Sequence, residues 1–356
     1  MIRLFKISKL TIITFLVLCI TTCAKEKDRC FPDSVWLAPD SIEEMGYDSQ
    51  KLSIIRKQII DSLNTTGLVV VVDGKILFEY GDIEELSYIA SCRKSLLSMM
   101  FGNYVENGTI DLDMTLEELD IDDIQGLLPI ERQATIRDLI SARSGIYHPA
   151  SNEGSDLRHA PPRGSVKPGE YYLYNNWDFN AAGGIFEQLT HKDIYETFEH
   201  DIAIPIQMQD FKLENQQKNG DSTKSNFLAY HFWVSTRDMA RLGLLMLNQG
   251  NWNGNQVIPM DWVELSTSTI TPTSEINPEF KREWKLAYGY MWWIWNDDNE
   301  IFEASYYAAG AYGQYLAIIP KLNMVISHKT KYAYRRITEF PEFRELVYKI
   351  IDSKIE

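Results

Sequence analysis

The sequence predicts an α+β fold: an antiparallel sheet flanked by helices, with a mainly helical region inserted between its early and late strands. Three observations predict this arrangement. A β-rich hairpin pattern at 67–80 lies between two helical patterns, at 49–63 and 90–105. Several β-rich runs follow residue 286, and the long stretch between the two β-rich parts is mainly helical or irregular. The sheet region is assigned to 46–110 and 266–356, and the inserted region to 111–265.

The first elements of the sheet region follow from apolar spacing and turn chemistry. Residues 49–63 are predicted to form an amphipathic helix, because apolar side chains recur there at helical spacing. The hairpin turns at Asp73-Gly74, a strong turn pair between two runs rich in β-branched residues. The helix of 90–105 follows, with large apolar side chains in its later turns.

The inserted region carries several helical segments and one long loop. A helix begins near Thr135 and ends before Gly145, and a proline-containing loop at 147–168 follows it. A loop this long inside a compact domain usually borders a site. Further helices are expected at 180–190, 193–202, 236–248 and 259–266. The helix of 236–248 is strongly amphipathic, with Thr236 as its expected N-cap.

The last part of the chain returns to β-rich sequence. The runs expected to form an antiparallel meander are 288–295, 301–308, 314–319 and 324–329. Turn residues separate them, including Asp297-Asp298 and Pro320. A helix over 341–355 closes the chain.

Residues 1–22 are predicted to be a lipoprotein signal peptide. They carry three basic residues and then an apolar run at 10–20, too short for a comfortable membrane span, and they end just before Cys23. We expect cleavage before Cys23 and lipidation of that cysteine, which predicts an exported bacterial lipoprotein anchored on the periplasmic or cell-surface side of a membrane. Residues 23–45 would form a tether. An uncleaved anchor is the alternative.

The net charge, the histidines and the cysteines narrow the classes of partner and cofactor that the protein is expected to bind. Without residues 1–22 the chain has 32 Lys and Arg against 50 Asp and Glu, a net charge of −18. Such a surface repels nucleic acid and offers no basic patch to anionic lipid, so membrane attachment would depend on the lipid anchor. The six histidines form no H-E-x-x-H motif, and we expect neither a metal nor an organic cofactor. A Cys30–Cys92 bridge is not expected, because Cys92 should point into packed structure.

The segment Ser91-Cys92-Arg93-Lys94 is the first candidate for catalysis. Ser91 would lie on the first turn of the helix of 90–105, where free N–H groups and the helix dipole favour a developing negative charge. Lys94 lies on the same helical face, and a buried amine can lose its charge and accept the serine proton. The S-x-x-K pattern also occurs by chance, and the alternative is that Ser91 only caps the helix. Ser144 lacks a G-x-S-x-G context and is interpreted as helix-end structure.

A second motif, Tyr174-Asn175-Asn176, lies 80 residues after Lys94 and precedes a predicted helix. A tyrosine whose pKa is lowered by a nearby ammonium can act as a general base or acid, and the amide two residues on can hold both substrate and lysine. A Y-x-N pattern alone is weak evidence for a catalytic site. It becomes informative because it follows Ser91 and Lys94 in an ordered set.

This ordered set resembles the serine β-lactamase and penicillin-binding-protein-like hydrolases, in the branch related to class C β-lactamases, carboxylesterases and 6-aminohexanoate-dimer hydrolases. The resemblance covers about 49–349. Its further marks are the segments 135–145, 168–170, 236–243, 250–254 and 309–314. It implies a β-lactamase/transpeptidase-like fold.

The resemblance also implies roles for individual residues. Ser91 would be the nucleophile that accepts the acyl group, and Lys94 its proton partner. Tyr174 would be the general base and acid, and Asn176 a ligand of substrate and lysine. The N–H groups of Ser91 and Ala311 would form the oxyanion hole, which needs only backbone.

The family's third motif, a basic residue two positions before a glycine, is incomplete here. The aligned Ala308-Ala309-Gly310 keeps the glycine but lacks the cation that helps to hold a substrate carboxylate, which weakens the case for β-lactams and carboxylate-ended peptides. Lys329-Thr330-Lys331 lacks the glycine and follows a later strand, so it is not taken as the motif. Trp177, beside Asn176, either lines an apolar acyl pocket or belongs to the core.

The leading functional prediction is a serine hydrolase that cleaves an ester or amide bond of a small-molecule or peptide substrate through an acyl-enzyme on Ser91. A β-lactamase or D,D-peptidase acting on cell-wall peptides is one alternative, which the missing cation disfavours. A non-catalytic sensor with the same fold is the other. The presence of serine, lysine, tyrosine and asparagine together disfavours the sensor.

Overall fold

The structure is a computed structural model that describes residues 30–152, 154 and 156–355. The predicted signal peptide, Cys23 and the first part of the predicted tether lie outside the described residues. Among the helices of the described residues, none has the length and apolar character needed to cross a membrane.

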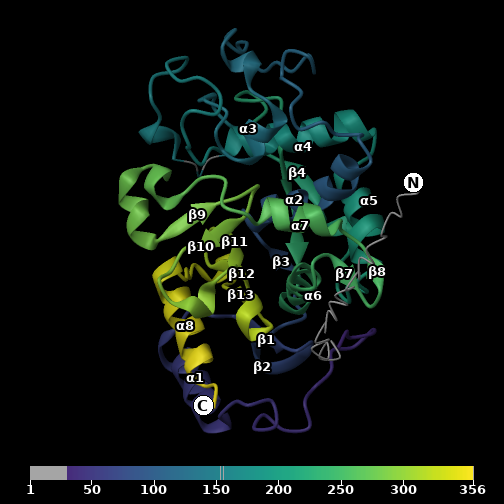
Figure 1. Cartoon of the computed structure of the whole chain (residues 1–356), viewed down its shortest axis with the longest axis vertical. Helices are drawn as coiled ribbons and strands as arrows, with labels where there is room; N and C mark the ends of the chain where they lie inside the picture. Colours follow the sequence, from purple (N-terminus) through teal and green to yellow (C-terminus); the bar gives the residue numbers. More distant parts are fainter. Residues whose placement is uncertain (1–29, 153, 155, 356) are drawn as a thin grey trace, which may run out of the picture.

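A seven-stranded antiparallel sheet forms the centre of the molecule, with the strand order β2-β1-β13-β12-β11-β10-β9 (Figure 1). Its strands are β1 (Gly67–Val72), β2 (Lys75–Gly81), β9 (Leu286–Tyr288), β10 (Trp293–Trp295), β11 (Tyr306–Gly310), β12 (Gln314–Ile319) and β13 (Met324–Lys329). β1 pairs with β13 along its whole length, from Gly67 opposite Lys329 to Val72 opposite Met324. The early hairpin therefore joins the late strands, and the predicted α+β architecture is confirmed.

The strands bury both faces, because alternate side chains enter two separate cores. Val69 and Val71 lie in a core with side chains of α2 (Cys92–Glu106) and α6 (Thr236–Leu247). Leu68 and Val70 lie in the other core, with side chains of α1 (Ser49–Ser62) and α8 (Phe340–Asp352), which contact each other (Figure 1). Burial on both faces explains why β1 is a continuous apolar run without alternation.

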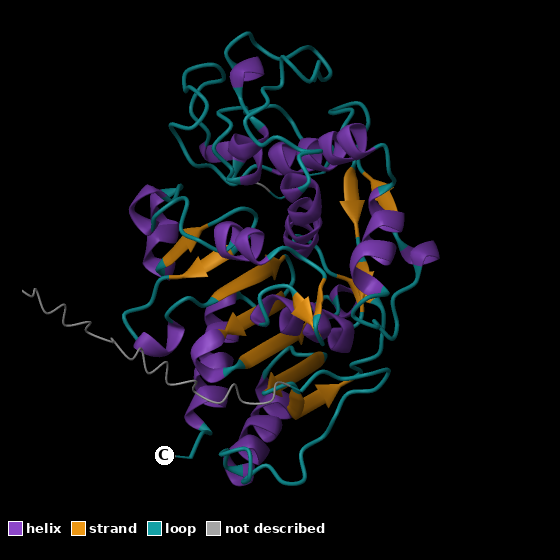
Figure 2. Ribbon diagram, turned by 45° about the vertical axis from the view of Figure 1, so that its right-hand side comes forward, coloured by secondary structure: helices purple, strands orange, loops and turns teal. Residues whose placement is uncertain are grey.

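The inserted region supplies α3 (Ile136–Ile140), α4 (Asn176–Thr190) and α5 (Ile194–Phe198), which lie above the sheet in the views of Figures 1 and 2, with long loops beyond them. Thr135 and Asp138 form a capping box that begins α3, as the predicted start near Thr135 requires. α7 (Met260–Ser266) lies within one residue of its predicted range.

α6 lies within the predicted inserted region but packs against β1, β12 and β13. Gly243 allows this close approach, because a Cβ there would lie 2.4 Å from Val325 and 2.9 Å from Leu316. α6 is therefore part of the layer that covers the sheet. Its N-cap is Ser235 and not Thr236, because the Ser235 hydroxyl accepts a backbone N–H of the first turn at 3.1 Å.

Three short two-stranded sheets in the described part of the chain were not expected from the sequence. They are β3 (Ser87–Tyr88) with β6 (Trp233–Val234), β4 (Gln217–Asn219) with β5 (Ala229–His231), and β7 (Asn251–Trp252) with β8 (Asn255–Gln256). Strands of two or three residues are too short to show a period of two, so no sequence pattern marks them.

The predicted strand of 288–295 is two strands, β9 and β10, because the chain turns between them. Gly289 approaches α7 so closely that a Cβ would lie 2.3 Å from the Ser266 carbonyl oxygen. Met291 has a left-handed φ of 62°, and its N–H donates to the Ile140 carbonyl oxygen of α3 at 3.0 Å. Contacts to neighbouring helices thus override the β-rich composition.

Residues 30–45, predicted to belong to a tether, pack against the folded domain instead. The Arg241 guanidinium of α6 donates to the carbonyl oxygens of Pro32 at 3.5 Å and of Asp33 at 2.7 Å. The Trp36 indole N–H donates to the Arg237 carbonyl oxygen at 3.3 Å. These bonds connect the segment to α6, so residues 32–36 belong to the folded domain.

Candidate active site

Ser91 lies at the N-cap position of α2 and is only partly buried. Its side chain makes no capping hydrogen bond, so the alternative that Ser91 serves only as a helix cap is wrong. Ala90, immediately before it, has a left-handed φ of 49°, a conformation that costs energy for any residue other than glycine. The Cys92 N–H donates to the Ile89 carbonyl oxygen at 3.2 Å and helps to hold this turn.

Lys94 connects the candidate residues. Its Nζ lies within hydrogen-bond distance of three oxygens: Ser91 Oγ at 3.1 Å, Tyr174 Oη at 2.5 Å and Asn176 Oδ1 at 2.7 Å. The side chain is 1% exposed. Burial, and then the neighbouring Arg93 guanidinium, hold the pKa of Lys94 well below its ordinary value. This environment favours the uncharged amine, which is the form that can accept a proton.

Tyr174 lies before α4 and reaches both Ser91 and Lys94. Burial raises the pKa of Tyr174 above its ordinary value, and a hydrogen bond with Ser91 opposes part of the rise. The hydroxyl therefore stays protonated in the resting site, and the Lys94 amine is the favoured base. The expected role of Tyr174 as the general base and acid stays a prediction, and the raised pKa favours the acid part of that role.

The start of α4 positions Asn176. Asn175 is the N-cap, because its Oδ1 accepts the Trp177 N–H at 3.1 Å, and its Nδ2 donates to the Ile146 carbonyl oxygen at 2.6 Å. α4 therefore begins four residues earlier than the predicted helix of 180–190. Asn176 is its first residue, and its amide oxygen faces the Lys94 amine.

Gly310, at the end of β11, lies against the backbone of the nucleophile. A Cβ at this position would lie 2.4 Å from the Ile89 carbonyl oxygen and 3.1 Å from the Ser91 nitrogen. Only glycine allows this approach. Ala311 follows as an exposed residue of the turn between β11 and β12. The expected oxyanion hole, built from the N–H groups of Ser91 and Ala311, is consistent with this placement.

Neither Lys329 nor Lys331 replaces the missing cation of the third motif. Ala308 is fully buried on β11. The Lys329 amine donates to the Ser87 carbonyl oxygen at 3.0 Å and to that of Val234, so it is committed to the β3–β6 pair. Burial lowers the pKa of Lys329 to about 7. Lys331 instead forms an ion pair with Glu85.

Trp177 belongs to the core and does not line a pocket. It has no exposed surface, its indole N–H donates to Asp123 Oδ2 at 2.6 Å, and its ring packs edge-on against Phe227. A buried carboxylate needs such donors, which explains the position of the indole. Ser144 is also structural, as predicted, because its hydroxyl is buried and donates to Asp178 Oδ1 at 2.7 Å.

The sequence interpretation missed Trp293 and Arg93. Trp293 stacks on the Tyr174 ring with centroids 5.7 Å apart, and both side chains are half-buried. It belongs to the aromatic run of β10, where alternation alone could not tell which tryptophan faces the site. Arg93 is buried beside Lys94, but the S-x-x-K pattern places no requirement on that position.

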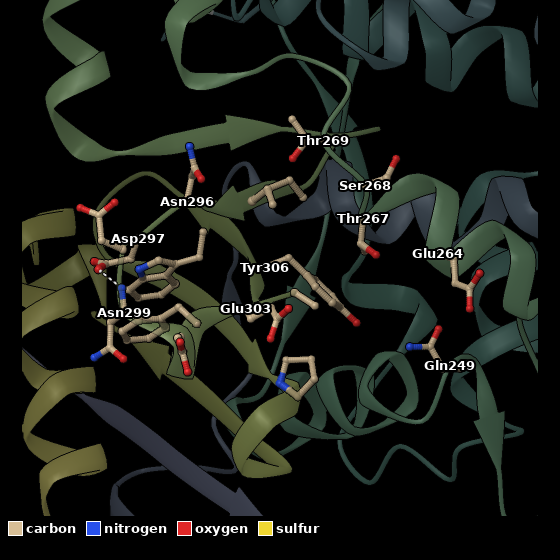
Figure 3. Close-up of a pocket in the computed structure, with 17 residues that line it drawn as sticks. Gln249, Glu264, Thr267, Ser268, Thr269, Asn296, Asp297, Asn299, Glu303 and Tyr306 are labelled. Atoms are coloured by element: carbon tan, nitrogen blue, oxygen red, sulfur yellow. Dashed lines mark hydrogen bonds between the residues drawn. The ribbon is translucent and has the colours of Figure 1, made fainter.

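A cavity of about 920 Å³ lies at the opposite end of β11 from Gly310 (Figure 3). Its lining is mainly polar and includes Glu264, Asp297 and Glu303, with Tyr306 at the start of β11. None of the described residues that line it is a lysine or histidine, so it contains no serine–lysine pair of the kind that Ser91 and Lys94 form.

A family model described as Beta-lactamase matches residues 57–334. The chain belongs to the β-lactamase family. The match includes Ser91, Lys94, Tyr174 and Asn176, so the expected family is confirmed. Membership of the β-lactamase family supports a serine hydrolase-like function.

Solved structures share the fold of this β-lactamase family member. A candidate 6-aminohexanoate-dimer hydrolase from Bacillus anthracis is 22% identical with a TM-score of 0.61, covering 83% of this chain and 80% of that chain. A candidate β-lactamase from Bacteroides dorei is 19% identical with a TM-score of 0.61, covering 86% and 99%. A penicillin-binding protein homologue from Caulobacter crescentus is 12% identical with a TM-score of 0.62, covering 90% and 99%. The predicted β-lactamase/transpeptidase-like fold is confirmed.

Gly310→Ala should lower kcat for an aryl ester by about 10²–10³-fold, the usual cost of losing one oxyanion-hole donor. The added Cβ would lie 2.4 Å from the Ile89 carbonyl oxygen, so β11 must move away from the Ser91 backbone. Ala309→Ser, at a half-buried position on the same strand, is the control and should keep the wild-type kcat. Wild-type turnover by folded Gly310→Ala, checked by circular dichroism, would contradict the assigned role of the glycine.

Proposed function

We propose that this protein cleaves an ester or amide bond of a small-molecule or peptide substrate through an acyl-enzyme on Ser91. One observation carries the proposal: the Lys94 amine lies 3.1 Å from Ser91 Oγ at a buried position that disfavours its charge. This pair supplies a nucleophile together with its base. Tyr174 and Asn176 hold the amine in place.

In the acylation step, Ser91 Oγ attacks the substrate carbonyl carbon and its proton passes to Lys94 Nζ. The carbonyl oxygen becomes an oxyanion, which the N–H groups of Ser91 and Ala311 would stabilise. As the tetrahedral intermediate collapses, the bond to the leaving group breaks, and the leaving group takes a proton from the Tyr174 hydroxyl. Tyr174 regains a proton from the Lys94 ammonium through their 2.5 Å hydrogen bond.

Deacylation uses water in place of the Ser91 hydroxyl. Water gives a proton to the Lys94 amine, directly or through Tyr174, and the resulting hydroxide attacks the acyl carbon. The bond to Ser91 Oγ then breaks, and the serine oxygen takes the proton back from Lys94. Side chains and backbone of the chain supply every group in this scheme, so the proposal includes no metal or organic cofactor.

The walls of the site support a neutral, apolar acyl group. The stacked rings of Tyr174 and Trp293 offer a half-buried aromatic surface. The third-motif position holds Ala308, so a substrate carboxylate would find no cation there. The same features disfavour a β-lactam or a D,D-peptide, which carry carboxylates.

Exposure of the full chain to an activated aryl ester, and separately to a penicillin, tests the function directly by intact-mass spectrometry. We expect an acyl adduct or rapid turnover with the ester, and neither in Ser91→Ala, because only the serine can hold the acyl group. A long-lived penicillin adduct without ester reaction would favour the cell-wall alternative. Absence of any Ser91-dependent reaction with either compound would overturn the proposed function and favour a sensor.

Lys94→Met and Tyr174→Phe should each lower kcat/KM for the aryl ester by about 10²–10⁴-fold, as losses of proton-transfer groups do. Both changes keep the approximate shape of the side chain. Ser144→Ala is the matched control, because that hydroxyl donates only to Asp178 and accepts from the Ile146 N–H in the core. Near wild-type kcat/KM in either site variant would show that a different group moves the proton.

We also propose, from the sequence alone, export and lipidation at Cys23, which would make a membrane the partner of the mature protein. In cells fed an alkyne analogue of palmitate, the protein should acquire the label and Cys23→Ser should not. Cys30→Ser is the control, because Cys30 is a free thiol of the described domain. Equal labelling of wild type and Cys23→Ser would contradict the proposal.

A further inference from the structure

Arg93, next to Lys94 on α2, carries a buried positive charge without a neutralising partner. Its side chain is 1% exposed. One terminal nitrogen donates to Asn180 Oδ1 at 2.5 Å, and the guanidinium lies 4.2 Å from the centre of the Tyr230 ring. The other terminal nitrogen, Nη1, has no hydrogen-bond partner among the described residues, and no described carboxylate forms an ion pair with Arg93.

This arrangement differs from that of most arginines in the inserted region and its neighbours, which pair with acids. The ion pairs are Arg137 with Asp113, Arg143 with Glu275, Arg163 with Glu131, and Arg237 with Asp210 and Glu84. Burying an unpaired charge is costly, so it persists only where the surroundings hold it in place. Asn180 and Tyr230 do so for Arg93 through an amide oxygen and a ring face, neither of which cancels the charge.

We propose that Arg93 is a positioning residue that acts on catalysis through charge: the uncompensated guanidinium disfavours a second positive charge on the adjacent Lys94 and so maintains the free amine that accepts the Ser91 proton. The proposal rests on the proposed function for its catalytic consequence, but not for the effect of Arg93 on Lys94. An arginine suits this task because its guanidinium stays protonated in proteins.

Among the other charged and titratable groups around the two side chains, Asp156 and Cys92 act against Arg93 on Lys94, and Lys281 acts with it. Asp156, which faces Lys94 from the loop before α4, is already in an ion pair with Lys281. Burial raises the pKa of Asp178 on α4 well above its ordinary value, and the pKa of Cys92 to about 12, so both groups favour their neutral forms. Around Arg93 lie the neutral side chains Tyr88, Tyr195, Tyr230 and His231.

A second group responds to the same charge. His231 on β5 has a pKa lowered to about 4, by burial first and by Arg93 second, and its Nδ1 has no hydrogen-bond partner in the described part of the chain. The guanidinium therefore lies close enough to disfavour a positive charge on two bases that belong to different elements.

The test measures Lys94 directly by carbon-13 NMR of the full chain labelled at the lysine ε-carbons, with the Lys94 signal assigned by its loss in Lys94→Met. Arg93→Met should raise the pKa of Lys94 by about one unit, because a nearby like charge is removed. The rise of kcat/KM with pH for an aryl ester should move upward by the same amount. The sign follows because activity requires the uncharged amine, which then forms only at higher pH.

Two further variants separate charge from structure. Asn180→Asp keeps the side-chain shape and places a carboxylate at the 2.5 Å contact with Arg93, so it should also raise the pKa of Lys94. Arg241→Met is the matched control, because Arg241 is a second fully buried arginine, close to Trp36 and Trp252 and far from Ser91 in the fold.

A Lys94 pKa that is unchanged in both Arg93→Met and Asn180→Asp would overturn the proposal, and so would an equal change in Arg241→Met. Asn180→Asp keeps the test decisive if Arg93→Met does not fold. The NMR measurement requires no substrate, so it is independent of the proposed function. A shifted Lys94 in a protein with no Ser91-dependent reaction would support the charge effect while removing the proposed hydrolase activity.

Discussion

The structure depends on a lysine amine buried where a positive charge is disfavoured. Lys94 Nζ contacts three oxygens, none of which belongs to a carboxylate, and burial holds the pKa of Lys94 well below its ordinary value. An amine in such a place is useful only if its neighbours are fixed to within a few tenths of an ångström. The start of α2 and the start of α4 supply those neighbours, and the end of β11 lies against the Ser91 backbone.

Backbone conformation and helix capping position these three elements more than large side chains do. Ala90 takes a left-handed turn before Ser91, the Asn175 cap sets where α4 begins, and Gly310 lets β11 approach the serine nitrogen. Each of these three features determines which residue of its element lies at the site. The helices and the two cores around the sheet then hold these positions without contributing to the chemistry.

Residue type and order along the chain were enough to predict that Ser91, Lys94 and the Y-x-N motif lie together, because those residues have chemical requirements that few others meet. Contacts between distant segments could not be predicted in the same way. Trp177 adjoins Asn176 in sequence but serves the buried Asp123. The turn at Gly289 depends on α3 and α7, and the bonds of residues 30–36 depend on Arg241 and the neighbouring backbone. The sequence does not indicate a role for Arg93, because its proposed effect on Lys94 depends on the lack of a nearby acid that pairs with it.

The packing of residues 30–45 has a consequence for orientation at a surface. With a lipid on Cys23, only about seven residues separate the anchor from Cys30, a reach of roughly 25 Å when fully extended. Cys30 lies against Gly74, at the turn that ends β1. Ser91 and Gly310 lie near the opposite end of the strands, where Gly67 pairs with Lys329. A protein held so closely would stand on the bilayer by its β1–β2 turn, with its reactive serine directed outward and open to molecules arriving from the surrounding medium.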